Sequence, residues 1–389
     1  MTIDVFGESY PNLVDLITPR LRLIAWEITR SCNLFCAHCR ASAAYGPYRG
    51  ELSTGEALQL IDEIVKVGKP VLILSGGEPL LRHDLFQIAE YAVNKGLRVV
   101  MGTNGTLITE NIAARLKEIP ISRIGVSLDF PVAELQDKFR GKAGAFEAAI
   151  AGIAEARRAN INVQINSTIT KLNAPYLNDL VNLALRVGAI AFHPFLLVPT
   201  GRGKGLQSVQ LLPDEYERIL NWFYDKQIEL ADKIFFKPTD APQYLRIVRQ
   251  RSRKGEPQGA VATEKPEPTG IHNRMNSLTR GCLAGIGFCF ISHQGRVQGC
   301  GYLDVEAGNI KRESFKKIWS DSPLFLELRD LSNIKGKCGI CQYKKVCGGC
   351  RARAYEVTGD YLESEPYCFY EPRRLPKDKI RTEAKNAGV

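Results

Sequence analysis

The cysteines constrain this chain more than any other residue type. Three of its eleven cysteines occur within residues 32–39, and the other eight lie between residues 282 and 368. The N-terminal residues lack the basic and apolar segments of an export signal, and no apolar run reaches the length of a membrane-spanning helix. We therefore expect a cytoplasmic protein without a membrane partner. Because disulfides are rare in that compartment, two dense groups of cysteines predict metal or redox chemistry.

Six short apolar segments, rich in β-branched residues, alternate with longer segments of helical period. The expected strands are residues 21–28, 70–75, 97–105, 121–129, 162–170 and 189–198. Helices such as 54–68 and 85–96 lie between them and end at a glycine. Repeated strand–helix units predict a parallel sheet that right-handed crossovers curl into a barrel, so the expected fold is α/β with a partial (β/α)6 barrel of the TIM type. Chemistry in such barrels occurs in the loops after the strands, and the first cysteine group directly follows the first strand.

The rest of the chain differs in character. Residues 211–251 have the pattern of helices, and residues 253–270 are rich in proline, glycine and charge, as in a linker or mobile loop. The remainder carries eight cysteines, many glycines and only short strand signals, which predicts a small domain organised by metal more than by an apolar core. The expected divisions are an N-terminal extension (1–20), a barrel (21–210), a helical bridge and linker (211–275), a small cysteine-rich domain (276–370) and a basic tail (371–389).

The chain carries a net charge of +10. A basic protein of this kind would attract a nucleic acid or an anionic membrane, and it would equally attract a small substrate with several carboxylates. Charge alone does not choose among these partners, or between them and a solvated surface with no specific partner.

The first cysteine group has the spacing Cys-x3-Cys-x2-Cys. Zinc sites close their shell with four ligands, usually two from each of two turns. Three thiolates from one turn instead suit three irons of a [4Fe-4S] cluster and leave the fourth iron open to an external ligand, although a zinc or structural site remains an alternative for this spacing alone. After the second expected strand comes the sequence SGGEP, in which glycines would let the backbone approach a ligand and Glu78 would offer a carboxylate to an ammonium group.

A Cys-x3-Cys-x2-Cys loop after the first strand and Gly-Gly-Glu-Pro after the second resemble the radical S-adenosylmethionine (SAM) superfamily. The resemblance implies that the open iron binds the amino and carboxylate groups of SAM. Reductive cleavage of SAM would then yield a 5′-deoxyadenosyl radical that abstracts hydrogen. By the same resemblance Cys32, Cys36 and Cys39 would hold the cluster, and His38 would lie against adenine.

The resemblance implies further contacts with SAM. Its ammonium end would be bound by Gly76, Gly77 and Glu78. Asn104 and Ser127, after the third and fourth strands, resemble positions that contact SAM, with ordinary turn and cap chemistry as the alternative. Arg140 resembles an arginine that pairs with the SAM carboxylate, a role that suits a guanidinium fork, with a plain surface ion pair as the alternative.

The C-terminal cysteines resemble the SPASM extension of radical SAM enzymes, which carries two auxiliary [4Fe-4S] clusters. By this resemblance the nearer cluster is held by Cys282, Cys289, Cys300 and Cys350, and the farther cluster by Cys338, Cys341, Cys347 and Cys368. Two residues separate the last pair of grouped cysteines where the family commonly has three, so the division of ligands between the clusters stays open. The rival interpretation is one cluster together with zinc or free thiols.

Flanking sequence indicates a particular reaction. The segments LIAWEITRSCNLFCAHCRASA and CGGCRARAYEVTGDYLESEPYC resemble the heme synthases of the siroheme-dependent pathway. The resemblance implies oxidative decarboxylation of two propionates of iron-coproporphyrin III to vinyl groups, which gives heme b. The adenosyl radical would abstract a propionate hydrogen, the auxiliary clusters would accept the electron, and a flavodoxin or ferredoxin would be the external donor. A substrate with four carboxylates also fits the basic charge, without a nucleic-acid partner.

Residues that contact this substrate are harder to predict. Arg202, Arg351 and Arg353 are candidate propionate anchors, with surface charge as the alternative. His193 is a candidate iron ligand or propionate donor, and Tyr355 a candidate hydrogen-bond donor, with a core histidine and a packed aromatic residue as the alternatives. Two other functions remain open: a related tetrapyrrole enzyme such as 12,18-didecarboxysiroheme deacetylase, and a peptide-modifying maturase. A non-enzymatic electron carrier is disfavoured because the GGEP loop would then hold no ligand.

Overall fold

The computed structural model describes residues 2–3, 9–10, 20–256 and 280–372. Most of the predicted N-terminal extension, of the predicted 253–270 loop and of the basic tail lies outside the described residues. None of the described helices is both long and apolar enough to cross a membrane.

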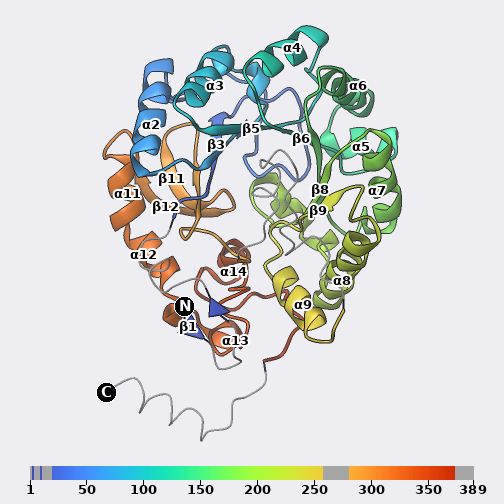
Figure 1. Cartoon of the computed structure of the whole chain (residues 1–389), viewed down its shortest axis with the longest axis vertical. Coiled ribbons are helices and arrows are strands. Elements are labelled where there is room, and N and C mark those ends of the chain that lie inside the picture. The colour runs from blue at the N-terminus through green and yellow to red at the C-terminus, as the bar shows by residue number, and fades with distance from the viewer. Residues whose placement is uncertain (1, 4–8, 11–19, 257–279, 373–389) are drawn as a thin grey trace, which may run out of the picture.

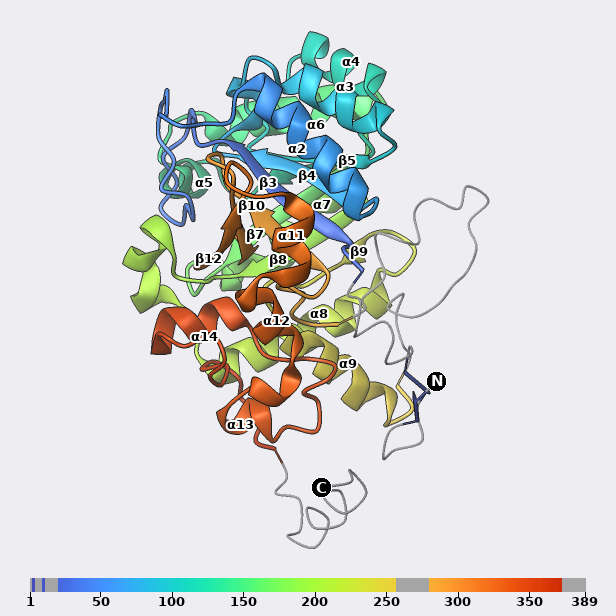
Figure 2. The ribbon, with the colours of Figure 1, turned by 90° about the vertical axis from the view of Figure 1, so that its left-hand side faces the viewer.

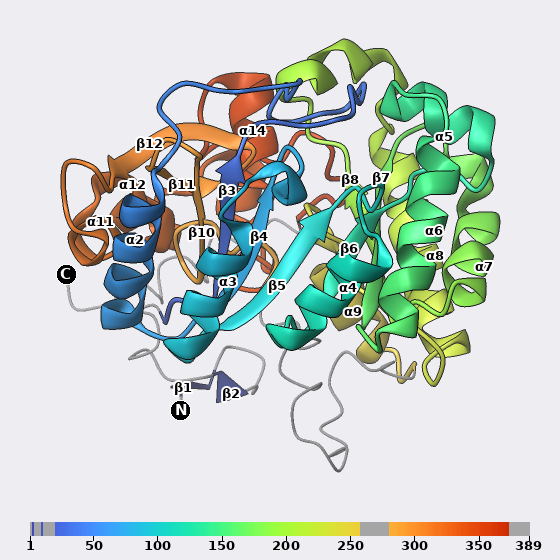
Figure 3. The same ribbon diagram turned by 90° about the horizontal axis from the view of Figure 1, so that it is seen from above.

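A parallel sheet forms the centre of the fold, with helices around its outer side (Figures 1 and 3). Its barrel strands are β3 (Leu23–Thr29), β4 (Val71–Gly76), β5 (Arg98–Thr103), β6 (Ile124–Ser127), β7 (Val163–Ile169) and β8 (Ala191–Leu196). The helices between them are α2 (Thr54–Val67), α3 (Leu85–Asn94), α4 (Glu110–Glu118), α5 (Ala133–Arg140), α6 (Ala145–Arg158) and α7 (Leu177–Arg186). The predicted strands are all present, and the predicted partial (β/α)6 barrel is confirmed.

Local sequence explains where these elements begin and which way they face. α2 begins after Ser53, whose backbone N–H donates to the Glu56 carboxylate while its hydroxyl accepts from the Glu56 backbone N–H. In β7 the side chains of Val163, Ile165 and Ile169 join the apolar core under the helices. Side chains alternate along a strand, so the residues between these point to the inside of the barrel. Two of the inward residues are the amides Gln164 and Asn166.

The sheet continues beyond the barrel on both sides. At one edge β9 (Phe235–Phe236) pairs with β8, and α8 (Pro213–Glu229) and α9 (Gln243–Ser252) lie on either side of it in the chain. At the other edge β10 (Phe288–Ile291) pairs in parallel with β3, followed by antiparallel β11 (Arg296–Cys300) and β12 (Leu303–Asn309). The predicted helical bridge therefore contains a strand, and the cysteine-rich region is joined to the barrel through one sheet.

The C-terminal region also has an apolar core. Phe315 and Trp319 of α11 (Phe315–Asp321) and Phe325 of α12 (Pro323–Arg329) are buried in the same core as the barrel residues. Figures 1 and 2 show α12 next to α11, with α14 (Arg351–Thr358) and α13 (Gly336–Gly339) between α12 and the helices α8 and α9. The prediction of a domain organised by metal more than by core understates this packing, because helices of seven residues contain too few turns for their apolar period to be recognised.

The remaining elements are short. They are β1 (Thr2–Ile3), β2 (Ser9–Tyr10), and the 3₁₀ segments η1 (Pro79–Leu81), η2 (Ala174–Tyr176), η3 (Gly201–Val209) and η4 (Leu331–Asn333). Of these, η1 and η3 adjoin the candidate site.

Candidate active site

The first cysteine group lies in a loop, residues 32–39, that follows β3 and is held by distant elements. The Phe35 N–H donates to the Arg140 carbonyl at the end of α5, with a distance of 3.1 Å. The Arg202 N–H, at the start of η3, donates to the Cys39 carbonyl, also at 3.1 Å. The loop is therefore fixed at the carboxyl-end rim of the barrel, where the sequence places it.

The thiols of this loop lie close to one another. The Leu34 N–H donates to Cys32 Sγ at 3.4 Å, and the Ala43 N–H donates to Cys39 Sγ at 3.3 Å. Burial raises the pKa of Cys32 to about 11 and also raises the pKa of Cys36, and neighbouring thiols add to both shifts. Three thiolates can coexist here once a cation compensates them. The residues therefore fit an iron–sulfur cluster ligated by all three.

The two glycines of the SGGEP loop serve backbone packing. A Cβ on Gly76 would lie 2.3 Å from the Thr29 carbonyl oxygen, and a Cβ on Gly77 would lie 2.3 Å from the Ser31 carbonyl oxygen. The Gly77 N–H donates to the Thr29 carbonyl at 2.8 Å. The sequence predicts that these glycines admit a ligand; in the structure they admit the backbone that leads into the cysteine loop. Their contact with SAM stays a prediction.

Glu78 connects two of the rim loops. Its Oε1 accepts from the Thr103 hydroxyl at 2.8 Å and from the Leu80 N–H at 3.2 Å, and its Oε2 accepts from the Asn104 N–H at 2.7 Å. The side chain is fully buried, and burial raises its pKa to about 7 despite these donors. The structure thus gives Glu78 a positioning role, and its contact with the SAM ammonium group stays a prediction.

Asn104 and Ser127 lie where the sequence places them. Asn104 Nδ2 donates to Asn33 Oδ1 at 2.8 Å, and its Oδ1 accepts from the Thr106 N–H at 2.9 Å, so this side chain joins the loop after β5 to the cysteine loop. Ser127 is the last residue of β6 and is half-buried. The turn chemistry proposed as the alternative for Asn104 is therefore present, and the contacts of both residues with SAM stay predictions.

His38 and Arg140 meet protein partners at this rim. The His38 ring stacks on Phe139 with 4.6 Å between ring centres, and burial lowers the pKa of His38 to about 4, so the ring is neutral. Arg140 forms a buried ion pair with Asp129, and its Nη1 lies 3.8 Å from Cys36 Sγ. The ion pair proposed as the alternative is therefore present, but it is buried beside a cluster thiol instead of lying on the surface.

A buried network that the sequence did not reveal joins β3 to the C-terminal region. Glu27 accepts from Arg40 Nη2 at 2.6 Å and lies 2.7 Å from His293 Nδ1. Burial acts to raise the pKa of Glu27, but Arg40 and His293 outweigh it and lower the pKa to about 2. Arg40 Nη1 also donates to the Gly301 carbonyl at 3.2 Å. Arg40 follows Cys39 in the chain, and Gly301 follows Cys300. This hydrogen bond therefore joins the first cysteine group to the C-terminal cysteines.

Three of the four cysteines predicted for the nearer auxiliary cluster are gathered. Cys282 and Cys350 are close enough to Cys300 for their charges to raise its pKa, after the larger effect of burial. Cys289 is not with them. Its neighbour in β10, Phe290, faces Arg40, whereas Cys289 points the other way into the apolar core and is fully buried. Burial raises the Cys289 pKa, and no thiol contributes to that shift.

A carboxylate lies beside these three cysteines. Asp240 has a buried Oδ2 without a hydrogen-bond partner in the described residues, and its negative charge raises the pKa of both Cys300 and Cys350. Its backbone has a φ of 54°, in the left-handed region that few residues other than glycine adopt. Asp240 is a residue that could hold the iron that Cys289 does not reach.

The four cysteines predicted for the farther cluster line one small pocket. They are Cys338, Cys341, Cys347 and Cys368. Cys282 N–H donates to the Cys347 carbonyl at 3.1 Å, which links this group to the nearer one. Within the described ranges, no three Cys, His, Asp or Glu side chains converge closely enough to hold a single metal ion.

The arginines predicted to anchor propionates have protein partners. Arg202 donates from Nε to the Cys36 carbonyl at 2.8 Å and from Nη1 to the Ala43 carbonyl at 2.7 Å. Arg353 is fully buried and donates to the Asp240 carbonyl at 2.8 Å. These donors hold loops in place. Arg353 is buried and so is not the surface charge given as its alternative, while propionate binding by Arg202 and Arg353 stays a prediction.

Of the other substrate candidates, Arg351 and Tyr355 also contact protein groups, whereas His193 lies inside the barrel. Arg351 Nη1 donates to the carbonyls of Tyr361 and Glu363 at 2.9 and 2.8 Å, so it fixes the C-terminal segment. Tyr355 packs in α14 near the ring of Tyr361, at 6.4 Å between ring centres. His193 faces the inside of the barrel from β8, where the sequence places it.

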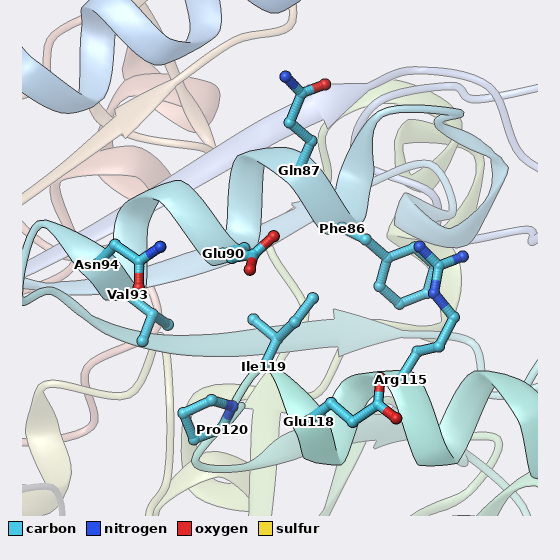
Figure 4. Close-up of a pocket in the computed structure, with 9 residues that line it drawn as sticks. All are labelled: Phe86, Gln87, Glu90, Val93, Asn94, Arg115, Glu118, Ile119 and Pro120. Atoms are coloured by element: carbon cyan, nitrogen blue, oxygen red, sulfur yellow. The ribbon is translucent and has the colours of Figure 1, made fainter.

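A separate surface pocket of about 370 Å³ lies between α3 and α4. Figure 4 shows that Phe86, Glu90, Arg115 and Glu118 surround it. These helices are on the outer side of the barrel, so the pocket does not adjoin the cysteine loops (Figure 1).

Comparison with known proteins defines the class. A radical SAM superfamily model matches residues 26–184, and an iron–sulfur cluster-binding (SPASM) domain model matches residues 282–351. The structure of Streptococcus suis SuiB bound to S-adenosylmethionine has a TM-score of 0.66 to this chain at 16% identity, covering 91% of this chain and 77% of that one, and so shares the fold. The protein is a radical SAM enzyme with a SPASM extension, and its cofactors are SAM, a SAM-binding [4Fe-4S] cluster and two auxiliary [4Fe-4S] clusters.

Relatives narrow this class to a family. The chain is 51% identical over 351 residues to the AdoMet-dependent heme synthase of Methanosarcina barkeri, covering 90% of this chain and 97% of the relative. It is 48% identical over 365 residues to the AdoMet-dependent heme synthase of Nitratidesulfovibrio vulgaris, covering 94% and 96%. The chain belongs to the family of AdoMet-dependent heme synthases. A Methanosarcina barkeri protein named Fe-coproporphyrin III synthase is 34% identical over 381 residues, covering 95% and 92%.

Proposed function

We propose that this enzyme makes heme b from iron-coproporphyrin III by oxidative decarboxylation of two propionates to vinyl groups. The observation that carries the proposal is the 51% identity to an AdoMet-dependent heme synthase over nearly the whole of both chains. Identity to the relative named Fe-coproporphyrin III synthase is only 34%. Synthesis of iron-coproporphyrin III is therefore less well supported for this chain than synthesis of heme.

The cluster and SAM supply, when bound, a 5′-deoxyadenosyl radical that takes one hydrogen atom from the propionate β-carbon. For each propionate, one electron then leaves to an acceptor, the bond to the carboxylate breaks, and CO2 and a vinyl group result. The chain's own residues position these components. Cys32, Cys36 and Cys39 would hold the cluster, and Glu78 and Arg140 would fix the loops around it through the buried contacts described above.

The auxiliary clusters are the proposed electron acceptors. Arg40, next to Cys39, donates to the carbonyl of Gly301, next to Cys300, at 3.2 Å. The Cys282 N–H donates to a carbonyl of the farther group at 3.1 Å. These contacts connect the three cysteine groups in series, which supports the proposal that the auxiliary clusters take up the electron.

The proposal also includes an electron donor and a location. Each catalytic cycle consumes one electron for the cleavage of SAM, and we propose a flavodoxin or ferredoxin as its source. All eleven cysteines are free, which agrees with a reducing, cytoplasmic environment.

Anaerobic turnover tests this function. Protein reconstituted with iron and sulfide is given SAM, a strong reductant and iron-coproporphyrin III, and the porphyrin is followed by mass spectrometry alongside 5′-deoxyadenosine. We expect stepwise loss of two CO2 units with the accompanying hydrogens, no reaction with Cys36→Ala, and reaction with the matched control Cys289→Ala. If 5′-deoxyadenosine accumulates while the porphyrin mass is unchanged, the substrate assignment fails.

A further inference from the structure

The inside of the barrel carries hydrogen-bonding side chains on β7 and β8. Gln164 Nε2 donates to Asn166 Oδ1 at 2.7 Å and lies 3.0 Å from His193 Nδ1. Asn166 and His193 are neighbours in the strand register. On the adjacent strand, a Cβ at Gly125 would lie 2.7 Å from Asn166 Nδ2, so the glycine leaves room for the amide. Barrels of this type usually fill such layers with branched apolar residues, so this interior is unusually polar.

Two cations face the same interior. Arg123, immediately before β6, is 3% exposed, and its Nη1 lies 3.4 Å from Gln164 Oε1. Lys237 lies immediately after β9, and its backbone N–H donates to the Phe192 carbonyl at 3.1 Å. This backbone bond places Lys237 beside His193, the residue that follows Phe192. Burial lowers the pKa of Lys237, and the charge of Arg123 lowers it further. We call Arg123, His193 and Lys237 the interior basic cluster.

The interior basic cluster lacks a negative partner. Within residues 20–256 and 280–372, no carboxylate forms an ion pair with Arg123 or Lys237, and no acidic group contributes to their pKa shifts. His193 Nε2 is buried and has no hydrogen-bond partner among those residues. Three other buried arginines, Arg82, Arg140 and Arg246, each pair with a carboxylate. Because an unpaired charge inside the barrel is costly, an anion that the described residues do not supply would stabilise the cluster.

We propose that the interior basic cluster binds the carboxylate of the propionate that enters the barrel to react. The inference rests on the proposed function and deepens it. Arg123 directly precedes β6, His193 lies in β8 and Lys237 directly follows β9, inside the barrel whose carboxyl-end rim carries the cysteine loop. A propionate that reaches the cluster from the side of the cysteine loop passes that rim. Loss of CO2 leaves an uncharged vinyl group that no longer compensates the cations. The same cluster therefore favours release of that edge of the porphyrin and entry of the second propionate.

Binding without turnover tests the inference. Iron-coproporphyrin III is titrated anaerobically into reconstituted protein without reductant and followed by its Soret absorbance. Lys237→Met should weaken binding about 10-fold to 100-fold, because a desolvated charge pair is lost. Lys233→Met, four residues earlier and exposed, is the matched control and should bind as the wild type does. Arg123→Gln should weaken binding in the same direction.

A second porphyrin identifies which propionates are bound. Iron-mesoporphyrin IX carries ethyl groups where the two reacting propionates of the substrate stand. Wild-type protein should bind it about 10-fold or more weakly than iron-coproporphyrin III, and Lys237→Met should lose this preference. Unchanged affinity and preference in Lys237→Met would overturn the inference while leaving the heme-synthase function standing. If the wild type binds neither porphyrin, the proposed function itself fails.

Thermal stability separates binding from a structural role. Removing an unpaired, half-buried charge should raise the melting temperature of substrate-free Lys237→Met, and this rise would accompany the weaker porphyrin binding. A residue needed for folding would instead lower the melting temperature when replaced. A lowered melting temperature with parallel loss of SAM binding would therefore contradict the inference.

Discussion

Replacement of Arg40 by methionine tests whether the buried network between two cysteine groups stabilises the fold. Glu27 is fully buried, and burial acts to raise its pKa from the usual 4.5, yet Arg40 is the largest of the opposing influences that lower it to about 2. A decrease of this size corresponds to about 3 kcal/mol in favour of the buried carboxylate. Arg40 is the largest of the lowering influences, and its loss would leave a buried carboxylate without its main partner. Arg40→Met should therefore lower the free energy of unfolding by about 3 kcal/mol at pH 7.

The pH dependence of stability supplies a second test of the same network. A carboxyl group whose pKa is lowered in the folded state stabilises above its usual pKa, here 4.5, and this contribution is lost as the pH falls toward about 2. Wild-type protein should therefore lose stability on acidification from about pH 5, and Arg40→Met should lose less of it.

Anaerobic denaturant titrations at pH 7, 5 and 4 measure both effects. Arg49→Met, at an exposed position near the same loop, is the matched control and should have wild-type stability. A cost below about 1 kcal/mol for Arg40→Met at pH 7, or an acid dependence equal to that of the wild type, would refute the reasoning.

Three further perturbations address individual residues of the site. Cys289→Ala should keep about 12 iron atoms per chain, whereas Cys300→Ala should lose about 4, as iron and sulfide analysis will show; equal losses would place Cys289 at a cluster after all. Glu78→Gln should lower stability by about 1–3 kcal/mol in thermal unfolding, because its amide N–H₂ would oppose a backbone or hydroxyl donor; an unchanged melting temperature would exclude this contact. Gly77→Ala should reduce incorporation of the SAM-binding cluster, measured by electron paramagnetic resonance, because its Cβ would meet the Ser31 carbonyl; a full signal would show that the loops can separate.

The barrel was predictable because its strands and helices have strong, separate periods. The β-branched runs of β3 to β8 are bounded by glycines and helix caps, and parallel connection leaves few topologies. Addition of β10 to the same sheet was not predictable in this way. Phe288 pairs with Leu23, more than 260 residues earlier in the chain, and a strand of four residues carries too little pattern to specify its partner.

The candidate site was predictable in its residue types and less so in their partners. Spacing places the first three cysteines at the rim, but it does not show that Arg140 would meet Asp129 or that Arg202 would hold the Cys36 carbonyl. These partners come from loops that only folding brings together. Cys289 illustrates the same limit, because the one-residue alternation of a strand decides whether its thiol faces a cluster or the core.

The interior cations have a signal in the sequence that the cysteine motifs do not include. Arg123 interrupts the apolar run ISRIGVSLD, and Lys237 ends the apolar run IFF. A charged residue at an inward position of a barrel strand is uncommon in a packed core, so it marks a polar interior or a ligand. Because side chains alternate along a strand, the sequences of β6 and β8 are enough to assign the inward face of each.

Transfer of deuterium tests the central claim most directly. Iron-coproporphyrin III deuterated at the propionate β-carbons is incubated anaerobically with the reconstituted enzyme, SAM and reductant, and 5′-deoxyadenosine is analysed by mass spectrometry. The account predicts one deuterium in each molecule of 5′-deoxyadenosine formed during turnover, two such molecules for each heme, and two molecules of CO2. Unlabelled 5′-deoxyadenosine formed in step with heme would contradict it, because the hydrogen would then come from another position.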